Sequence, residues 1–530
     1  MQTETIPFCK TGYFSKLICD YLAKDTAVKP FYNQYPDLDG FKKQIAEKRL
    51  SFDSASRAIL VQALENQYER FSITDETKRN IQLLEQENTF TVTTGHQLNL
   101  FTGPLYFLYK ILSTINLAER LRLEYPEAHF VPVYWMATED HDFEEINYFN
   151  FKGKKIHWNL ESRGAVGNLS TQELDSVFEA FSAQLPNTPD ADHLRDLFKK
   201  GYLEHKTLTD ATRYIANELF GKFGLVIIDG DDRALKDLFA PYMEEELTRQ
   251  TSYKEVSQTI AELEKEYNIQ VNPREINLFY LTETSRDRIV FEKDRFQVVN
   301  SGINWTTEEI LKELYEFPER FSPNVIIRPL YQEVILPNLC YIGGGGELAY
   351  WLELKAFFDK VEIPFPVLLL RNSVLLLAEK QALKSAKLNI SIEELFLNTG
   401  DLVSKKVRES SSLVIDFSSQ REFLKKQFAE LEKIAEQTDR SFIGAVKAQT
   451  KKQLNGLDKL EKRLLKAEKK KHAELSGQIS KLKEELFPGG GLQERTKNFS
   501  EFYLEYGEKL ITALKEDLDP LKLEFSLNTL

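Results

Sequence analysis

Short apolar runs alternate with segments of helical periodicity through about the first 400 residues, and this alternation limits the fold more than any other feature. A run that is apolar at nearly every position suits a strand covered on both faces, as in a parallel sheet. We therefore predict an α/β fold with a Rossmann-like, doubly wound parallel sheet. The expected strands are FTVTT (90–94), 129–138, 223–230, 324–342 in two pieces, and 365–370.

Two segments interrupt this pattern, and a long helical region follows it. INYFNFKGKKIHWNL has the pattern of a hairpin with its turn at 152–155, and residues 276–305 alternate at period two like a β-meander. Both are interpreted as insertions at the edge of the sheet. The predicted organisation is an N-terminal helical segment packing on the core (1–88), a discontinuous core (89–150, 221–235 and 322–399), a first insertion (151–220), a second insertion with a meander (236–321), a coiled coil (400–488) and a C-terminal segment (489–530).

The coiled-coil prediction depends on the spacing of apolar residues. Between Leu424 and Phe442, and again between Leu457 and Leu486, they recur at steps of three and four. Long helices packed as a hairpin or against a second subunit are expected, with a homodimer formed through the coiled coil. The basic run at 459–483 is interpreted as a solvated helix face, which is the usual role of such runs.

Composition excludes several functional classes. The net charge of −13 and the pI near 5.4 argue against a general nucleic-acid-binding role. Cys9, Cys19 and Cys340 have neither the spacing of a zinc site nor the pairing of a disulfide framework. Because the N-terminus lacks the pattern of a signal peptide and no uncharged apolar run approaches 18 residues, a cytoplasmic protein without a membrane partner is expected.

The stretch TTGHQLNLFTGPLYFLYK joins the first expected strand to a helix. Gly95 permits a tight turn, Gly103 and Pro104 precede the helix, and His96 with Gln97 is expected at the carboxyl end of the strand. A helix N-terminus there favours anions, and a neutral imidazole can donate a hydrogen bond or transfer a proton. A histidine with a purely structural role is the alternative.

The stretch WMATEDHDFEEI follows the second expected strand with Glu139, Asp140, His141 and Asp142 in succession. Such a cluster could hold a divalent ion, or it could orient an ammonium group or sugar hydroxyls. An acidic helix cap is the simpler reading, although one carboxylate would suffice for that. No second ligand pair has a recognisable spacing, so no metal is predicted.

Four consecutive glycines occur in CYIGGGGELAYWLELKAFF, between an expected strand and a helix. Gly343, Gly344 and Gly345 would let the backbone approach a ligand, and Glu347 follows them. A structural turn needs only one or two glycines. The loop matches neither a Walker A motif nor a dinucleotide fingerprint.

Two further polar groups accompany expected strands. Arg328, Gln332 and Glu333 occur in strand-like sequence, where an unpaired charge would be costly. In LLLRNSVLLLAEK, three polar residues are expected between the last strand and its helix. Asn372 or Ser373 would cap that helix, whereas Arg371 could bind a phosphate or carboxylate.

Four stretches together resemble the BshC family, the cysteine-adding enzymes of bacillithiol biosynthesis, a low-molecular-weight thiol. They are TGHQLNLFTGPLYFLYK, VPVYWMATEDHDFEE, IIRPLYQEVILPNLCYIGGGGELAYW and FPGGGLQERTKNF, and the resemblance spans essentially the whole chain. It implies a Rossmann-like core related to nucleotidylyl-transferases and class I aminoacyl-tRNA synthetases, two connecting insertions and a coiled coil that supports a dimer. The activity it implies is ligation of L-cysteine to the amine of glucosaminyl malate.

The resemblance also implies roles for the candidate residues. His96, Gln97 and the helix after Gly103 would steady a nucleotide phosphate, since 95–97 stand where relatives carry a His-containing nucleotide motif, and 371–373 stand near a second signature loop. The chain lacks the two-histidine and Lys-rich motifs of the synthetases, so activation by ATP or another nucleotide is a hypothesis.

Acceptor binding is assigned to the remaining candidates. Glu139, Asp140 and Asp142 would orient the acceptor, and Arg328 or Arg371 would meet its carboxylates. His96 or a carboxylate would take the amine proton. The alternatives are a coiled-coil scaffold protein with a ligand-binding α/β core, and a sugar-nucleotide glycosyltransferase.

Overall fold

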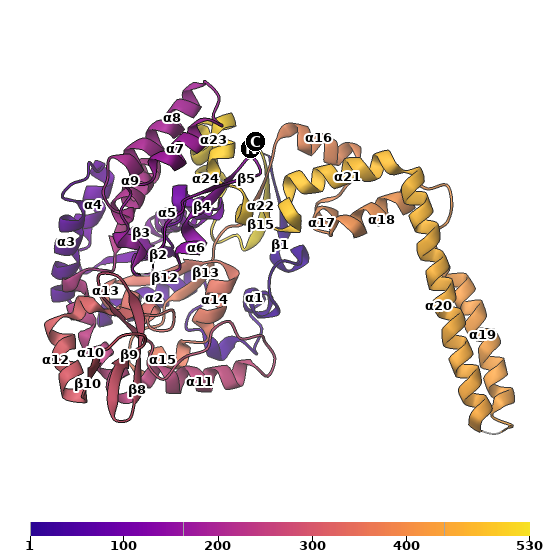
Figure 1. Cartoon of the computed structure of the whole chain (residues 1–530), viewed down its shortest axis with the longest axis horizontal. Helices are drawn as coiled ribbons and strands as arrows, with labels where there is room; N and C mark the ends of the chain where they lie inside the picture. The colour runs from indigo at the N-terminus through magenta and orange to yellow at the C-terminus, as the bar shows by residue number, and fades with distance from the viewer. Residues whose placement is uncertain (1, 163, 439) are drawn as a thin grey trace. The chain divides into compact units, whose positions relative to one another are not determined.

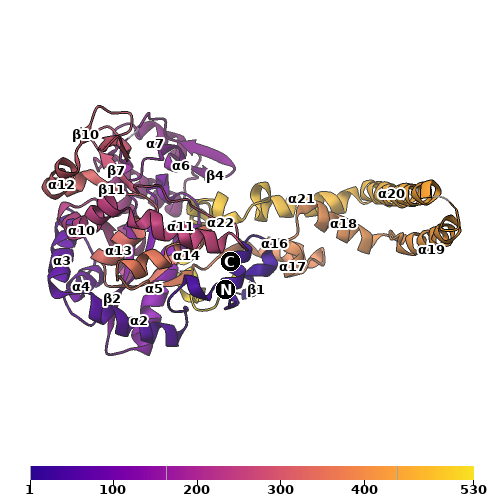
Figure 2. The ribbon, with the colours of Figure 1, turned by 90° about the horizontal axis from the view of Figure 1, so that it is seen from below.

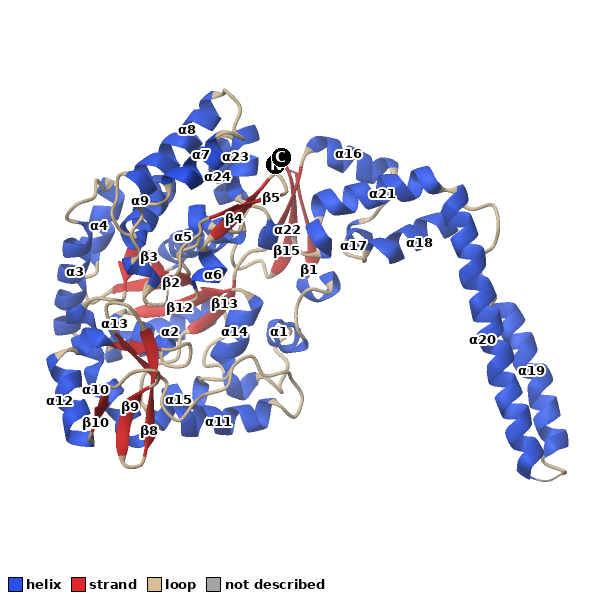
Figure 3. Cartoon of the chain, in the orientation of Figure 1, coloured by secondary structure: helices blue, strands red, loops and turns tan. Residues whose placement is uncertain are grey.

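The computed structural model describes residues 2–162, 164–438 and 440–530. These residues form two compact units, the first comprising Met1–Leu375 and Gln493–Asn528 and the second Leu376–Leu492 and Thr529–Leu530. Figure 1 follows the chain from end to end, and Figure 3 separates helices from strands. The first unit contains the parallel sheet, and the second is built mainly of helices.

A five-stranded parallel sheet organises the first unit, as predicted. Its order is β13 (Val367–Leu370), β12 (Asn338–Gly343), β2 (Thr89–His96), β3 (His129–Met136) and β6 (Val226–Asp229). From β2 the chain runs outward through β3 to β6, and it then returns to β12 on the other side of β2. This reversal is a topological switch point, where α/β sheets bind ligands outside the carboxyl ends of their strands.

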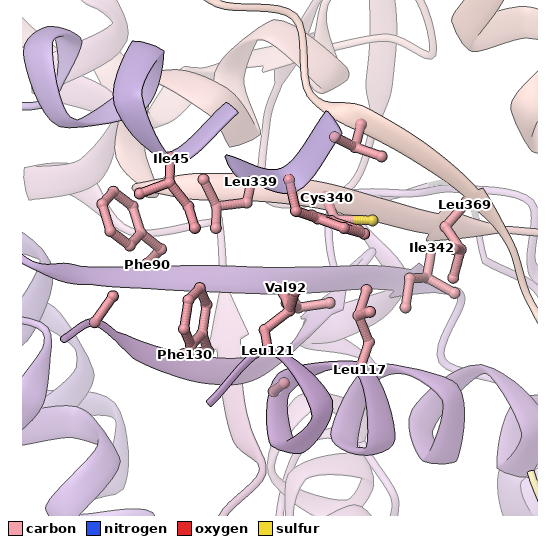
Figure 4. Close-up of a cluster of buried hydrophobic side chains, with 14 residues drawn as sticks. Ile45, Phe90, Val92, Leu117, Leu121, Phe130, Leu339, Cys340, Ile342 and Leu369 are labelled. Atoms are coloured by element: carbon pink, nitrogen blue, oxygen red, sulfur yellow. The ribbon is translucent and has the colours of Figure 1, made fainter. Parts of the chain in front are cut away.

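Apolar side chains cover both faces of this sheet. In Figure 4, Ile45 of α2 (Leu38–Ser51) lies on one side of the strands, and Leu117 and Leu121 of α5 (Tyr106–Glu124) lie on the other. Phe90 and Val92 of β2 are fully buried between these layers. Burial on both faces explains why β3 and β13 are apolar at nearly every position.

Helices account for most of the remaining first unit. Those near the N-terminus begin at side-chain caps, since Ser15, Asp53 and Thr74 each accept a backbone N–H of the first turn. The other helices of this unit are α1 (Lys16–Leu22), α3 (Ser54–Tyr68), α4 (Asp75–Leu83), α6 (Phe143–Ile146), α7 (Asp175–Ser182), α8 (Pro189–Phe198), α9 (Leu208–Phe220), α10 (Arg233–Arg249), α11 (Thr251–Leu263), α12 (Thr307–Glu316), α13 (Arg328–Ile335), α14 (Gly345–Leu352), α15 (Lys355–Lys360), α22 (Gln493–Thr496), α23 (Phe499–Tyr506) and α24 (Lys509–Asp517).

The smaller sheets include the predicted hairpin and meander. The hairpin pairs β4 (Tyr148–Phe151) with β5 (Lys154–His157), and its turn places Lys152 and Gly153 at φ values of 49° and 76°. The meander has the order β10 (Asn304–Trp305), β9 (Arg295–Val298), β8 (Arg286–Glu292), β7 (Leu278–Leu281) and β11 (Phe321–Pro323). A three-stranded sheet has the order β1 (Gln2–Pro7), β15 (Glu524–Thr529) and β14 (Val374–Leu377).

Two local predictions are wrong. Residues 324–342 contain one strand rather than two, because Arg328–Ile335 form the helix α13, with Pro329 in its first turn. This helix has only eight residues, so the spacing of its apolar residues is hard to distinguish from that of a strand. Residues 371–373 do not lead into a helix either; they connect β13 to β14, and the next helix begins at Glu379.

The second unit contains the predicted helical hairpin. In Figure 2, α19 (Ser418–Ala435) and α20 (Arg440–Lys471) lie side by side, and they make extensive contacts. The periodic sequence from 457 to 486 is divided at His472, whose ψ of 38° ends the first helix before α21 (Ala473–Leu486). The unit also contains α16 (Glu379–Lys387), α17 (Ile392–Leu395) and α18 (Thr399–Ser410). Of all the helices described, none has both the length and the apolar character needed to cross a bilayer.

Candidate active site

A cavity of about 410 Å³ opens at the switch point of the parallel sheet, beside the carboxyl ends of β2 and β12. Its walls also include residues from α5, α13 and α14 and from the segment before β7. Many of the residues predicted from the sequence meet there. Those that line it are Gly95, His96, Gln97, Asp140, Arg328, Gln332, Gly344, Glu347 and Arg371.

His96 is the last residue of β2 and pairs with Met136 of β3. Its side chain packs against the rings of Tyr106 and Phe107, and the residue is 7% exposed. Burial, together with the charge of Lys110, lowers the pKa of His96 well below 6.5. The imidazole is therefore uncharged at neutral pH, and no described residue is hydrogen-bonded to its Nε2.

Gln97 and Asp140 form the edge of the cavity between β2 and β3. The Gln97 amide donates hydrogen bonds to Asp140 Oδ2 at 3.2 Å and to Glu145 Oε2 at 3.0 Å. Burial would raise the pKa of Asp140, but Arg328 and Arg286 more than offset it and hold that pKa below its usual value of 3.8. Asp140 thus presents a carboxylate that is fixed in place and ionised at neutral pH.

Glu347 occupies the N-terminus of α14. Its carboxylate accepts hydrogen bonds from the backbone N–H of Gly344 at 2.9 Å and from the hydroxyl of Tyr341 at 2.8 Å, and Lys110 Nζ lies 2.6 Å away. Burial opposes the charge of Glu347, but Lys110 lowers its pKa. The helix end thus already binds an anionic group of the protein itself, which takes up one of the N–H groups expected for a ligand.

Close packing around Tyr341 accounts for two of the predicted glycines, Gly343 and Gly95. A Cβ on Gly343 would lie 2.9 Å from the Leu348 side chain and 3.0 Å from that of Tyr341. A Cβ on Gly95 would lie 3.2 Å from the Tyr341 hydroxyl, whereas Gly344 has only ordinary contacts. Two of these glycines therefore have a structural reason that does not involve a ligand.

Arg371 has a partner within the protein. Its Nη2 lies 2.7 Å from Glu494 Oε1, and its Nη1 donates to Ser373 Oγ at 3.0 Å. The side chain of Asn372 accepts a hydrogen bond from Ser113 at 2.8 Å. The polar residues after β13 therefore form a buried network in which the Arg371 charge is compensated by Glu494.

Arg328 and Arg495, unlike Arg371, have no bonded counter-ion in the described chain. Both line the cavity, and within the described chain neither guanidinium makes a hydrogen bond or an ion pair within 4 Å. Arg286 lies near Arg328, and burial together with the Arg328 charge lowers the pKa of Arg286 to about 10. The cavity therefore contains two guanidinium groups without a bonded counter-ion, which favours an anionic ligand.

Some predicted residues lie away from the lining of the cavity. Glu139 forms a buried ion pair with Lys236, Asp142 has a largely exposed side chain, and Glu333 pairs with Lys48 at 3.0 Å. Among the described residues, no group of three His, Cys, Asp or Glu side chains is arranged to hold a metal ion. The other predicted residues that do not line the cavity are Gly103, Gly343, Gly345, Asn372 and Ser373.

Sequence reasoning missed several lining residues. Lys110 occurs in a helix whose apolar periodicity dominates, so nothing in the sequence separates it from a surface lysine. Arg495 belongs to the quoted stretch FPGGGLQERTKNF, and the absence of a strand there concealed its role. The other missed residues include Tyr106, Trp135, Gln270, Val271, Tyr341, Tyr350 and Trp351.

Comparisons with known proteins agree along the whole chain. Residues 1–372 match the family model described as "Bacillithiol biosynthesis BshC, N-terminal Rossmann-like domain", and residues 374–530 match "Bacillithiol biosynthesis BshC, C-terminal coiled-coil domain". The prediction of a Rossmann-like core and a C-terminal coiled coil is thereby confirmed.

Curated relatives have the same extent. A protein of Flavobacterium johnsoniae is 57% identical over 530 residues, covering 100% of both chains, and one of Christiangramia forsetii is 55% identical, covering 100% of this chain and 99% of its own. Both have the name "Putative cysteine ligase BshC". A solved structure titled "Crystal structure of putative arginyl t-RNA synthetase from Campylobacter jejuni" matches 84% of this chain and 98% of its own at 11% identity, with a TM-score of 0.23.

Proposed function

The chain belongs to the BshC family of bacillithiol biosynthesis, and from that membership we propose that it joins the carboxyl of L-cysteine to the amine of glucosaminyl malate. The observation that carries the proposal is the cavity at the switch point, which combines two guanidiniums lacking a bonded counter-ion with two ordered carboxylates. An acceptor with an amine and two carboxylates has the complementary charges.

Recognition of the malyl group is assigned to Arg328 and Arg495. A guanidinium binds a carboxylate through paired hydrogen bonds, and the gain is largest where the charge is not already compensated. Arg371 is a weaker candidate because Glu494 lies 2.7 Å from it. Of the two arginines predicted from the sequence, Arg328 is therefore retained for direct contact.

The acceptor amine is assigned to the edge formed by Asp140 and Gln97. A protonated amine would be held by the Asp140 carboxylate, which the Gln97 amide fixes by a 3.2 Å hydrogen bond. The amine must lose a proton before it attacks a carboxyl carbon. Either the uncharged ring of His96 or the Asp140 carboxylate can receive that proton, and because the pKa of each group is lowered, the proton must then be passed on rapidly.

Activation of the cysteine carboxyl is the remaining requirement. ATP or another nucleotide, when bound, would supply a leaving group on that carboxyl. The residues that fit such a molecule are Gly344 and Gly346, whose lack of side chains leaves room beside the first turn of α14, and the aromatic side chains of Tyr106 and Trp351. Lys110 is held by Glu347 and orients that carboxylate.

We also propose a homodimer formed through the α19–α20 hairpin. Several large apolar side chains on these helices remain exposed within one chain, including Phe423 at 64% and Leu460 at 53%. Coiled-coil seams bury such residues against another helix. A second copy of the chain would supply that helix.

The test of the ligase proposal is a reconstitution with purified protein. Glucosaminyl malate and L-cysteine are incubated with and without ATP, and the thiol product is detected by mass. We expect product that depends on ATP or another nucleotide and that is lost in the His96→Ala variant. Product formed only from a sugar nucleotide would favour the glycosyltransferase alternative, and no product under any condition would favour the scaffold.

A further inference from the structure

The segment between α11 and β7, residues 264–277, forms one wall of the cavity without belonging to a helix or strand. Gln270 and Val271 line the cavity, although most residues from 268 to 275 are exposed or half-buried. A solvated segment of this kind needs fixed points if it is to present a defined surface to a substrate.

The two ends of the segment are fixed outside the cavity. Near its start, the Tyr267 hydroxyl donates to Asp20 Oδ2 at 3.0 Å. Near its end, the backbone N–H of Asn277 donates to Glu246 Oε1 at 2.9 Å, and that of Arg274 donates to Asn277 Oδ1 at 3.0 Å. None of these contacts holds the residues that line the cavity.

The middle of the segment is held by one buried carboxylate. The backbone N–H of Gln270 donates to Glu353 Oε1 at 2.7 Å, and the N–H of Val271 also bonds to this carboxylate. Glu353 is 1% exposed, and its Oε2 is buried without a hydrogen-bond partner among the described residues. Burial raises the pKa of Glu353 to about 7.

Local helix stability gives no reason for an acidic residue at this place. Glu353 is the C-cap of α14, where the helix dipole disfavours negative charge. Burying a carboxyl group is also costly unless it is hydrogen-bonded. The bonds to Gln270 and Val271 are the contacts that offset these costs. The role of Glu353 is therefore to hold the segment 264–277 in place.

The side chain of Gln270 adds a hydrogen-bonding amide to this wall of the cavity. Its Oε1 lies close to Gly346, with only 3.9 Å to the position that a Cβ there would take. No described residue hydrogen-bonds to the Gln270 amide, which can both donate and accept. Sugar hydroxyls need groups that can both donate and accept hydrogen bonds, as this amide can. The carboxylates of the acceptor would instead bind to the arginines.

We propose that Glu353 is a positioning residue that holds Gln270 in the cavity wall, and that the Gln270 amide contacts the hydroxyl groups of the glucosaminyl acceptor. The second part rests on the proposed function, because it names the substrate of the same site. The first part concerns the protein alone and can be measured without any substrate.

The first experiment is hydrogen exchange on the full-length protein without ligands. Loss of a charge-assisted hydrogen bond should raise the exchange rate of the Gln270 and Val271 amides about 10-fold or more in Glu353→Ala. Glu353→Gln, which keeps an acceptor oxygen, should have a smaller effect and guards against a failure of Glu353→Ala to fold. Glu246→Gln is the matched control, because it alters a buried carboxylate that fixes residue 277, outside the cavity. Unchanged exchange at 270–271 in both Glu353 variants would overturn the proposal.

The second experiment measures the two substrates separately. Gln270→Ala and Glu353→Ala should each raise KM for glucosaminyl malate about 3-fold to 10-fold, and Glu353→Gln should raise it less, with kcat and the KM for cysteine unchanged in all three, as expected for lost ground-state binding. Equal changes in both KM values, or none in either, would overturn the assignment of Gln270 to the acceptor. A parent protein without ligase turnover would contradict the proposed function, whereas faster exchange at 270–271 would still support the anchor.

Discussion

The ion pairs compared beside the cavity and in the α19–α20 hairpin differ in how deeply they are buried. Arg371 and Glu494 beside the cavity are paired at 2.7 Å, with side chains 4% and 0% exposed. In the hairpin, Arg421 and Asp458 are paired at 2.8 Å with side chains 26% and 49% exposed. A buried pair is costly to form and more costly to break, whereas an exposed pair contributes little. Removing one partner should therefore destabilise the fold far more in the buried pair than in the exposed pair.

The largest expected effect comes from breaking the buried pair. Glu494→Ala leaves Arg371 buried without its counter-ion, which should lower the free energy of unfolding by about 3–5 kcal/mol. Denaturant unfolding followed by far-ultraviolet circular dichroism measures it, since helices occur in both units and the signal therefore reports on both variants. The control is Asp458→Asn in the hairpin, for which no measurable change is expected. Equal effects of the two variants would contradict the comparison.

The second effect concerns activity instead of stability. A preorganised hydrogen-bonding group typically contributes about 10²–10³ in rate, or about 2.7–4 kcal/mol. His96→Ala should therefore lose most amide formation, while its melting temperature stays near that of the parent. Turnover and thermal unfolding are measured on the same preparation. Parent-like turnover would remove His96 from the mechanism.

The third effect separates an uncompensated guanidinium from an ordinary surface cation. Arg495→Met should raise KM for glucosaminyl malate about 10-fold to 100-fold, as expected from the loss of charged hydrogen bonds worth about 1.5–3 kcal/mol. Lys497→Met is the matched control, because Lys497 lies in the same segment and pairs with Glu501 at 3.7 Å. Similar KM values for the two variants would show that Arg495 does not bind the acceptor.

The fourth effect is a pH dependence. Burial raises the pKa of Asp231 from 3.8 to about 7, so between these pH values the folded protein keeps a proton that the unfolded chain has lost. Its contribution to stability is therefore present below about pH 4 and decreases as pH rises to about 7. Asp231→Asn should reduce this slope by at most one proton, about 1.4 kcal/mol per pH unit. Identical slopes for parent and variant would refute a raised pKa.

The smallest expected effect on folding is in the hairpin. Leu460 is 53% exposed within one chain, so Leu460→Glu alone should change the free energy of unfolding of the monomer by about 0.5 kcal/mol or less. Replacing both Leu460 and Leu464 by Glu should weaken the proposed dimer, as measured by sedimentation. An unchanged dimer would place its interface elsewhere.

Local sequence was sufficient to predict those elements whose own residues carry the signal for their structure. The strand at Thr89–His96 and the turn at Lys152 and Gly153 were predicted because burial on both faces and positive φ leave direct compositional signals. The helix Arg328–Ile335 was mistaken for strand because it has only eight residues, too few for helical spacing to be distinguished from the pattern of a strand. This wrong assignment placed Arg328 in a strand instead of a helix, but Arg328 still lines the cavity.

The sequence by itself determined the parallel sheet, the long C-terminal helices and the position of His96 at a strand end, since each follows from periodicity within a short stretch. Only the tertiary structure decided which charged side chains lack a bonded partner. The sequence singled out Arg371 after a predicted strand and gave no reason to choose Arg495, yet Glu494 compensates Arg371 while Arg495 has no bonded partner in the described chain. Glu353 likewise acts on Gln270, 83 residues earlier. Coulombic and hydrogen-bond energies depend on distance in space and on burial, and neither can be read from the separation of residues along the chain.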